Sequence, residues 1–112
     1  MSTENLALKD PSLLRQQAYI NGEWQSAANG ESFEVRNPAT GGLLGTVPAM
    51  GAAETRQAID AANAAWPAWR KKTAKERAAI LRKWHDLMME NADDLALILT
   101  TEQGKSLAEA KG

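Results

Sequence analysis

The spacing of apolar residues changes once along this chain of 112 residues, near Gly51, and this change constrains the fold more than any other feature. Before Gly51, apolar and polar residues alternate over short runs, which is the period of a strand with one buried face. After Gly51, apolar residues recur every three or four positions, which places them on one side of a helix. The sequence therefore predicts a small antiparallel β unit followed by helices.

An amino-terminal arm over residues 1–17 precedes the β unit, which we expect over residues 18–48. Leucines in the arm are mixed with polar residues and follow neither period. Pro11 fits the first position of a helix, since its fixed φ suits a helix start and its missing amide would have no partner there. We therefore expect one turn of helix after Asp10, before the first strand.

Two pairs of strands are expected in the β unit. Asn21-Gly22 tolerates the positive φ that a two-residue turn needs, so its flanking residues predict a short hairpin. Residues 33–36 alternate apolar with charged side chains, as in a strand with one buried face. Residues 43–47 are expected to return beside them, and Pro48 ends that strand because proline has no amide to donate.

Helices are expected through residues 51–112. The first ends near Pro67, since proline removes a backbone hydrogen bond. The second begins at Thr73, which can form a capping box with Glu76. Its apolar face consists of Ile80, Leu81, Trp84, Leu87 and Met88.

A third helix is expected to begin after Asn91, with Asp93-Asp94 capping its first turn, where the helix dipole is positive. Gly104 supplies a left-handed stop. Ser106 and the glutamate three residues after it resemble another capping box and predict a fourth helix. That helix has room for barely two turns, so we expect the chain to continue in a longer protein.

Composition excludes several kinds of chemistry in these residues. There is no cysteine, so no disulfide, thiolate nucleophile or cysteine-ligated metal is possible. The formal net charge is −1, and neither a signal peptide nor an apolar run of the ~18 residues that span a bilayer is present. We expect a cytoplasmic protein with no nucleic-acid or membrane partner.

Three candidate sites have simpler interpretations. His85 is the only histidine and is expected at a helix boundary rather than in a catalytic group. Basic residues between positions 70 and 83 are interspersed with acidic ones, which indicates a solvated helix face. A phosphate loop ending in Gly104-Lys105-Ser106 would need glycine where Leu99 stands.

Six short motifs follow one another along the chain: Tyr19-Ile20-Asn21-Gly22-Glu23-Trp24, Asn37-Pro38-Ala39-Thr40-Gly41, Leu44-Gly45-Thr46-Val47, Trp69-Arg70, Glu76-Arg77 and Glu102-Gln103-Gly104-Lys105. In this order they resemble the amino-terminal quarter of the aldehyde dehydrogenases. Residues 14–18, 50–52 and 84–90 are similar to the bacterial succinate-semialdehyde dehydrogenases. Ser106 stands where the family usually has proline, and either residue can begin a helix.

The resemblance implies a parent enzyme about four times this length, with an α/β fold that includes a Rossmann-like domain. It implies NAD or NADP as cofactor and a homo-oligomer, specifically a homotetramer. The implied reaction oxidises succinate semialdehyde to succinate in 4-aminobutyrate breakdown, through a cysteine thiohemiacetal and thioester. Glutarate semialdehyde or another aldehyde is the alternative substrate.

The residues that carry out this reaction in the family lie beyond this segment. The resemblance therefore implies no catalytic, cofactor-binding or metal residue in this chain. Residues 51–112 would be a truncated helical segment of the cofactor domain, and their partner would be the remainder of the dehydrogenase chain. In some relatives an acidic side chain and nearby carbonyl groups hold a monovalent cation, and Glu102 and the carbonyl groups around Val35 are the matching positions.

A second hypothesis remains open at this point. The chain could be a stand-alone helical module whose exposed Trp, Leu and Met side chains bind a partner protein. If the chain is instead part of a dehydrogenase, we expect the same apolar helix faces to be exposed or buried by self-association in isolation, because the missing part would cover them.

Overall fold

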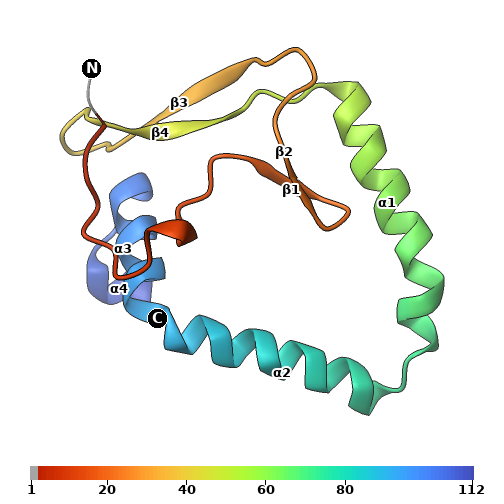
Figure 1. Ribbon diagram of the computed structural model, residues 1–112. Helices are drawn as coiled ribbons and strands as arrows, with labels where there is room; N and C mark the ends of the chain where they lie inside the picture. Colours follow the sequence, from red (N-terminus) through yellow and green to blue (C-terminus); the bar gives the residue numbers. More distant parts are fainter. Residues whose placement is uncertain (1–2) are drawn as a thin grey trace.

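The computed structural model describes residues 3–112, which form two β hairpins followed by four α-helices (Figure 1). This architecture confirms the predicted β unit followed by helices. In chain order the elements are η1 (Pro11–Leu13), β1 (Ala18–Ile20), β2 (Glu23–Gln25), β3 (Ser32–Arg36), β4 (Leu43–Pro48), α1 (Ala52–Lys71), α2 (Ala74–Glu90), α3 (Ala92–Gln103) and α4 (Leu107–Lys111).

The arm contains the single helical turn that Pro11 predicted. It is the 3₁₀ turn η1, and Asp10 caps it by accepting hydrogen bonds from the Ser12 amide at 3.1 Å and from the Ser12 hydroxyl at 2.5 Å. These bonds stabilise the charged form and lower the pKa of Asp10.

The Asn21-Gly22 turn joins β1 and β2 as predicted. Asn21 has a φ of 51° and Gly22 a φ of 78°, which is the left-handed pair of a tight hairpin turn. The strands pair antiparallel, with Tyr19 opposite Trp24. Their rings lie 5.0 Å apart between centroids, and the Arg15 guanidinium lies 4.6 Å above the Trp24 ring. A cross-strand aromatic pair thus supports a hairpin of two short strands.

Strands β3 and β4 form the second hairpin, antiparallel, with Val35 opposite Gly45 and an irregularity between Val35 and Arg36. The apolar face of β3 is only partly buried in the described residues. Phe33 is 57% exposed, whereas Val35 two positions along is half-buried.

Helix α1 contradicts the expectation that it would end near Pro67. It continues through this proline to Lys71, and the Lys72 amide donates to the Trp69 carbonyl at its end. A proline removes only one hydrogen bond from a helix, and the alanine, tryptophan, arginine and lysine that follow it continue the helix. His85 likewise lies within α2, exposed, and not at a helix boundary.

Local signals set the starts and ends of the later helices. Both bonds of the predicted capping box are present, each at 3.1 Å between Thr73 and Glu76. Asn91 donates its side-chain amide to the Leu87 carbonyl at 2.9 Å, so it caps the end of α2 and not the start of α3. Gly104 ends α3 with a φ of 88°, and the Ser106 hydroxyl accepts from the amide of Glu109 at 3.3 Å to begin α4.

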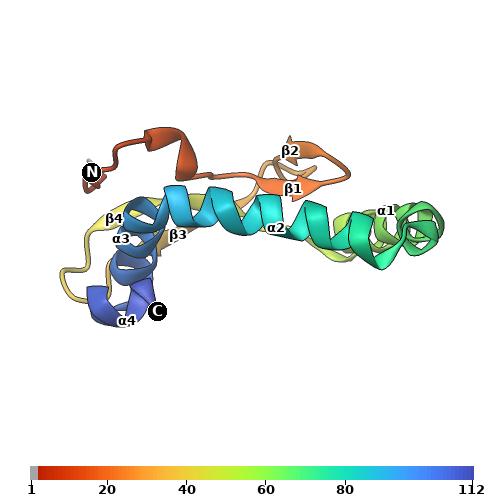
Figure 2. The same ribbon diagram turned by 90° about the horizontal axis from the view of Figure 1, so that it is seen from below.

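The elements follow one another around an open ring (Figure 1), and the view turned by 90° shows a flat molecule with the arm and β1–β2 on one side (Figure 2). The Cα radius of gyration is 16.9 Å, whereas a compact chain of this length has about 13 Å. The accessible surface is 8352 Å², against roughly 6,000 Å² for a compact monomer. The buried apolar residues are Ile20, Ala27, Leu44 and Ala96, so the described residues form almost no core.

Replacing Thr73 by alanine should destabilise the start of α2. It removes the acceptor of the Glu76 amide and should cost about 1 kcal/mol of helix stability. Circular dichroism of a synthetic peptide covering residues 70–92 should show lower helicity for Thr73→Ala than for the parent peptide. The control is Lys75→Ala, which leaves both capping bonds intact and should keep or raise helicity; equal helicity in all three peptides would contradict the capping role.

Candidate functional site

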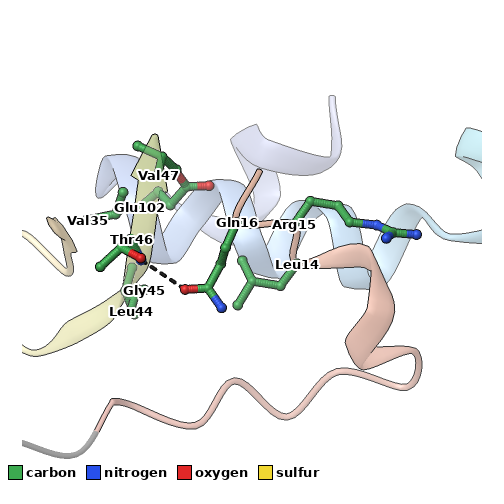
Figure 3. A pocket seen from close by; sticks show the side chains of 9 residues that line it. All are labelled: Leu14, Arg15, Gln16, Val35, Leu44, Gly45, Thr46, Val47 and Glu102. Carbon is green, nitrogen blue, oxygen red and sulfur yellow. Dashed lines mark hydrogen bonds between the residues drawn. The ribbon is translucent and has the colours of Figure 1, made fainter. Parts of the chain in front are cut away.

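A small pocket lies where the arm, the β3–β4 hairpin and α3 meet (Figure 3). It is the place in the structure that brings together residues from these three distant parts of the sequence. It is lined by Leu14, Arg15, Gln16, Val35, Leu44, Gly45, Thr46, Val47 and Glu102. Four of these residues have apolar side chains and four have polar or charged ones, of which Glu102 is the one acidic group.

Gln16 fixes the arm to β4 at the wall of this pocket. Its side-chain oxygen accepts a hydrogen bond from the Thr46 amide at 2.9 Å (Figure 3). The neighbouring Gly45 leaves room for that oxygen, since a Cβ atom at this position would lie 2.7 Å from it. The glycine of the Leu44-Gly45-Thr46-Val47 motif therefore allows the close approach of the arm.

Glu102 and Val35 line the same pocket, although 67 positions separate them in the sequence. Figure 3 shows the Arg15 side chain extending away from Glu102, so no cation of the described chain occupies this place. Glu102 is exposed in the described chain, and its carboxylate oxygens are hard ligands. The assignment of Glu102 and the Val35 region to a monovalent cation stays a prediction.

The Asn37–Gly41 motif folds into a tight turn at the end of the hairpin. The Asn37 side chain accepts from the Ala39 amide at 2.9 Å, and its backbone carbonyl accepts from the Gly41 amide at 2.8 Å. Glu4 of the arm accepts hydrogen bonds from the side chains of Thr40 and Asn37. These two bonds, with Thr40 first, lower the pKa of Glu4 below its ordinary value of 4.5.

The end of α3 rests against this turn. Gly104 has a φ of 88°, and a Cβ atom at this position would lie 3.1 Å from the Pro38 ring. The glycine is therefore needed twice, for the left-handed backbone and for the contact with proline. The two motifs that contain Asn37-Pro38 and Gly104-Lys105 thus meet in space.

Asp94 differs from its predicted role as a cap of α3. It is only 5% exposed, and its two carboxylate oxygens accept from the backbone amides of Lys9 and Asp10, each at 2.9 Å. Asp93 is exposed and pairs with Lys111 at 3.2 Å and Lys9 at 3.6 Å, and these lysines, Lys111 first, lower the pKa of Asp93. Asp93 and Asp94 at the start of α3 thus bind the middle of the arm, at Lys9 and Asp10.

Within residues 3–112 no three His, Asp or Glu side chains are close enough together to hold a metal ion. None of the helices described is long and apolar enough to cross a membrane. The basic residues of α1 and α2 are exposed except for Arg77 and alternate with acidic ones, as expected for a solvated helix face.

A family model matches residues 24–112, which include both hairpin strands at the pocket and all four helices. Its description is "Aldehyde dehydrogenase family". The chain belongs to the aldehyde dehydrogenase family.

Individual aldehyde dehydrogenases are similar over almost the whole chain. A glutarate-semialdehyde dehydrogenase of Pseudomonas putida is 66% identical over 107 residues, and so is the NADP(+) succinate-semialdehyde dehydrogenase of Escherichia coli. The crystal structure of succinate-semialdehyde dehydrogenase from Burkholderia pseudomallei is 73% identical and superposes with a TM-score of 0.92 over 95% of this chain. Each match covers 22% of the relative's length. The chain therefore corresponds to the amino-terminal part of such a dehydrogenase.

Replacing Gly104 by alanine should destabilise the contact between α3 and the Asn37–Gly41 turn. An alanine in the left-handed region costs about 1 kcal/mol or more, and its Cβ would press on Pro38. Hydrogen exchange of the full-length dehydrogenase should be faster at residues 37–42 and 100–106 in Gly104→Ala. Gly51→Ala is the matched control, because Gly51 has a φ of −104° and open space around it; equal exchange in both variants would contradict the packing role of Gly104.

Proposed function

We propose that this chain is part of an NAD(P)-dependent dehydrogenase that oxidises a short semialdehyde with a terminal carboxylate, and that succinate semialdehyde is its substrate. The observation that carries the proposal is the 73% identity to a succinate-semialdehyde dehydrogenase of known structure, with a TM-score of 0.92. Glutarate semialdehyde is the second candidate, because the P. putida and E. coli relatives, which act on different semialdehydes by name, are equally similar at 66%.

In the proposed reaction the aldehyde and water give the carboxylate, and NAD(P)⁺ takes the hydride when it is bound, with release of protons. A nucleophilic thiolate is required to form the thioester that water then hydrolyses. This chain has no cysteine. We therefore propose that its residues include no catalytic or cofactor-binding group and that the chemistry belongs to the rest of the enzyme.

We propose a structural role for the helices, as the part of the cofactor domain spanning residues 51–112. Apolar side chains on α1 and α2 are exposed, including Trp66 at 50% and Trp84 at 64%. Arg77 adds a second sign of a missing neighbour, since its Nε is buried without a hydrogen-bond partner among the described residues. Both features support helices that the remainder of the dehydrogenase covers, and they favour this role over a stand-alone binding module.

The substrate assignment is tested with the full-length enzyme that contains this chain. Succinate semialdehyde, glutarate semialdehyde and an uncharged aldehyde of similar length should be compared by kcat/KM, each with NAD and with NADP. We expect succinate semialdehyde to exceed the uncharged aldehyde by at least about tenfold, since a buried cationic contact to the terminal carboxylate is worth 1.5–3 kcal/mol. A higher kcat/KM with glutarate semialdehyde would select the second candidate, and a preference for the uncharged aldehyde would contradict both.

Replacing Leu87 by aspartate should damage the full-length dehydrogenase through the apolar face of α2. Leu87 is 48% exposed in this chain, but if the remaining chain covers it, the substitution buries an unpaired charge at a cost of several kcal/mol. The yield of soluble oligomer and its thermal midpoint should both fall sharply. Lys83→Asp places the same charge on the same helix at an exposed position and should leave both values near those of the parent. Equal behaviour of the two variants would show that this face of α2 is not covered.

A further inference from the structure

Hydrogen bonds to β4, its preceding turn and α3 fix the arm at three places, although it has almost no regular structure. Its last residues also contact the first hairpin and the residue after it, since Arg15 lies over Trp24 and Gln17 donates to the Ser26 hydroxyl at 3.2 Å. At the first place, the Glu4 amide donates to the Leu43 carbonyl at 2.6 Å, and the Glu4 carboxylate accepts from Asn37 and Thr40. These contacts join the beginning of the arm to the start of β4 and to the turn that precedes it.

The second place is the start of α3. Asp94 accepts one amide on each carboxylate oxygen, from Lys9 and from Asp10, across 84 and 85 positions of the sequence. Hydrogen bonds to an ionised and nearly buried acceptor are the strong ones. In contrast, the Lys9–Asp93 ion pair beside it is 3.6 Å long and well exposed, so it contributes little. Asp94 is thus the main attachment of the middle of the arm.

The third place is the pocket. Gln16 accepts from the Thr46 amide at 2.9 Å, and Leu14 and Gln16 form the wall that the arm contributes (Figure 3). The arm therefore starts on the β3–β4 hairpin, crosses to α3, and returns to β4, where it closes the side of the pocket that lies across from Glu102.

These three attachments are hydrogen bonds, and no residue from 3 to 17 is buried. Apart from the turn η1, the arm has no helix or strand hydrogen bonds of its own, so it opens locally at a lower free-energy cost than the helices and strands beside it. The arm also contributes no backbone pairing beyond the single bond to Leu43 that could hold it once the side-chain contacts are lost.

We propose that residues 3–17 form a strap that opens and closes as one unit over the pocket beside Glu102. The hydrogen bonds from the Lys9 and Asp10 amides to Asp94 keep the strap closed. When the strap is closed, the pocket is bounded by Leu14 and Gln16. When it opens, the Thr46 amide and the pocket wall of β4 become accessible to solvent. The strap is a conformational device of the fold and is independent of which aldehyde the enzyme oxidises.

The test is hydrogen exchange of the full-length dehydrogenase, compared between the parent and Asp94→Asn. Asparagine keeps the shape but offers one acceptor oxygen instead of two, so one of the amides of Lys9 and Asp10 loses its partner. We expect exchange at least about tenfold faster in peptides covering residues 5–14, the change that loss of a bond to a charged acceptor predicts. Peptides covering residues 43–48, which contain Thr46, should also exchange faster if the strap opens as a unit.

Asp86→Asn is the matched control, because Asp86 carries the same charge on α2 at an exposed position and pairs only with Arg82 among the described residues. It should leave exchange in the arm and in β4 unchanged. Faster exchange throughout residues 74–90 in Asp94→Asn would overturn the proposal, because Asp94 would then support the whole fold rather than a strap.

A second variant, at the pocket, tests whether the attachment at Gln16 opens together with the attachment at Asp94. Gln16→Ala removes the acceptor of the Thr46 amide and touches no residue near Asp94. Faster exchange at both Thr46 and residues 5–14 is the expected result for a strap. Faster exchange at Thr46 alone would show that the attachments open independently, and it would overturn the proposal even if Asp94→Asn failed to fold.

Discussion

The carboxylate of Asp94, bonded to two backbone amides of the arm, is the interaction that determines where the arm lies against α3. It is the one nearly buried charged group in the described chain, and two amide donors at 2.9 Å offset the cost of removing it from water. Through the arm it links α3 to β4, and the Gly104–Pro38 contact joins the end of α3 to the turn between β3 and β4. These two connections hold the start and the end of the chain together around the open ring of Figure 1.

Polar contacts have this importance because an apolar core is almost absent. A folded chain of this size ordinarily gains most of its stability by burying apolar surface. Here the large side chains of α1 and α2 stay exposed, and the start of α2 is determined by the Thr73 capping box and not by packing. Family membership accounts for the exposure, since the relatives are several times longer and the missing length can cover these faces.

The parts of the fold that were predictable from sequence are those set by residues within four positions of one another. The Asn21-Gly22 turn, the Thr73 capping box and the left-handed Gly104 depend on local backbone geometry, and all three are present. What could not be predicted depends on distant partners. Asp94 resembles a helix cap, and nothing within the local sequence indicates that its acceptors face Lys9, 85 positions away. The continuation of α1 through Pro67 was missed because a proline inside a helix and one at its end look alike in sequence.

The same distinction explains why the family could be identified from sequence while the substrate could not. The motifs that carry the resemblance stand where the backbone is constrained: the Asn37 turn, Gly45 under the arm, and Gly104 against Pro38. Such constraints belong to the shared fold and do not involve the aldehyde. Relatives named for succinate and for glutarate semialdehyde are accordingly equally similar to this chain. Residues that distinguish one semialdehyde from another must contact it, and the thiolate that the proposed reaction requires is absent from this chain.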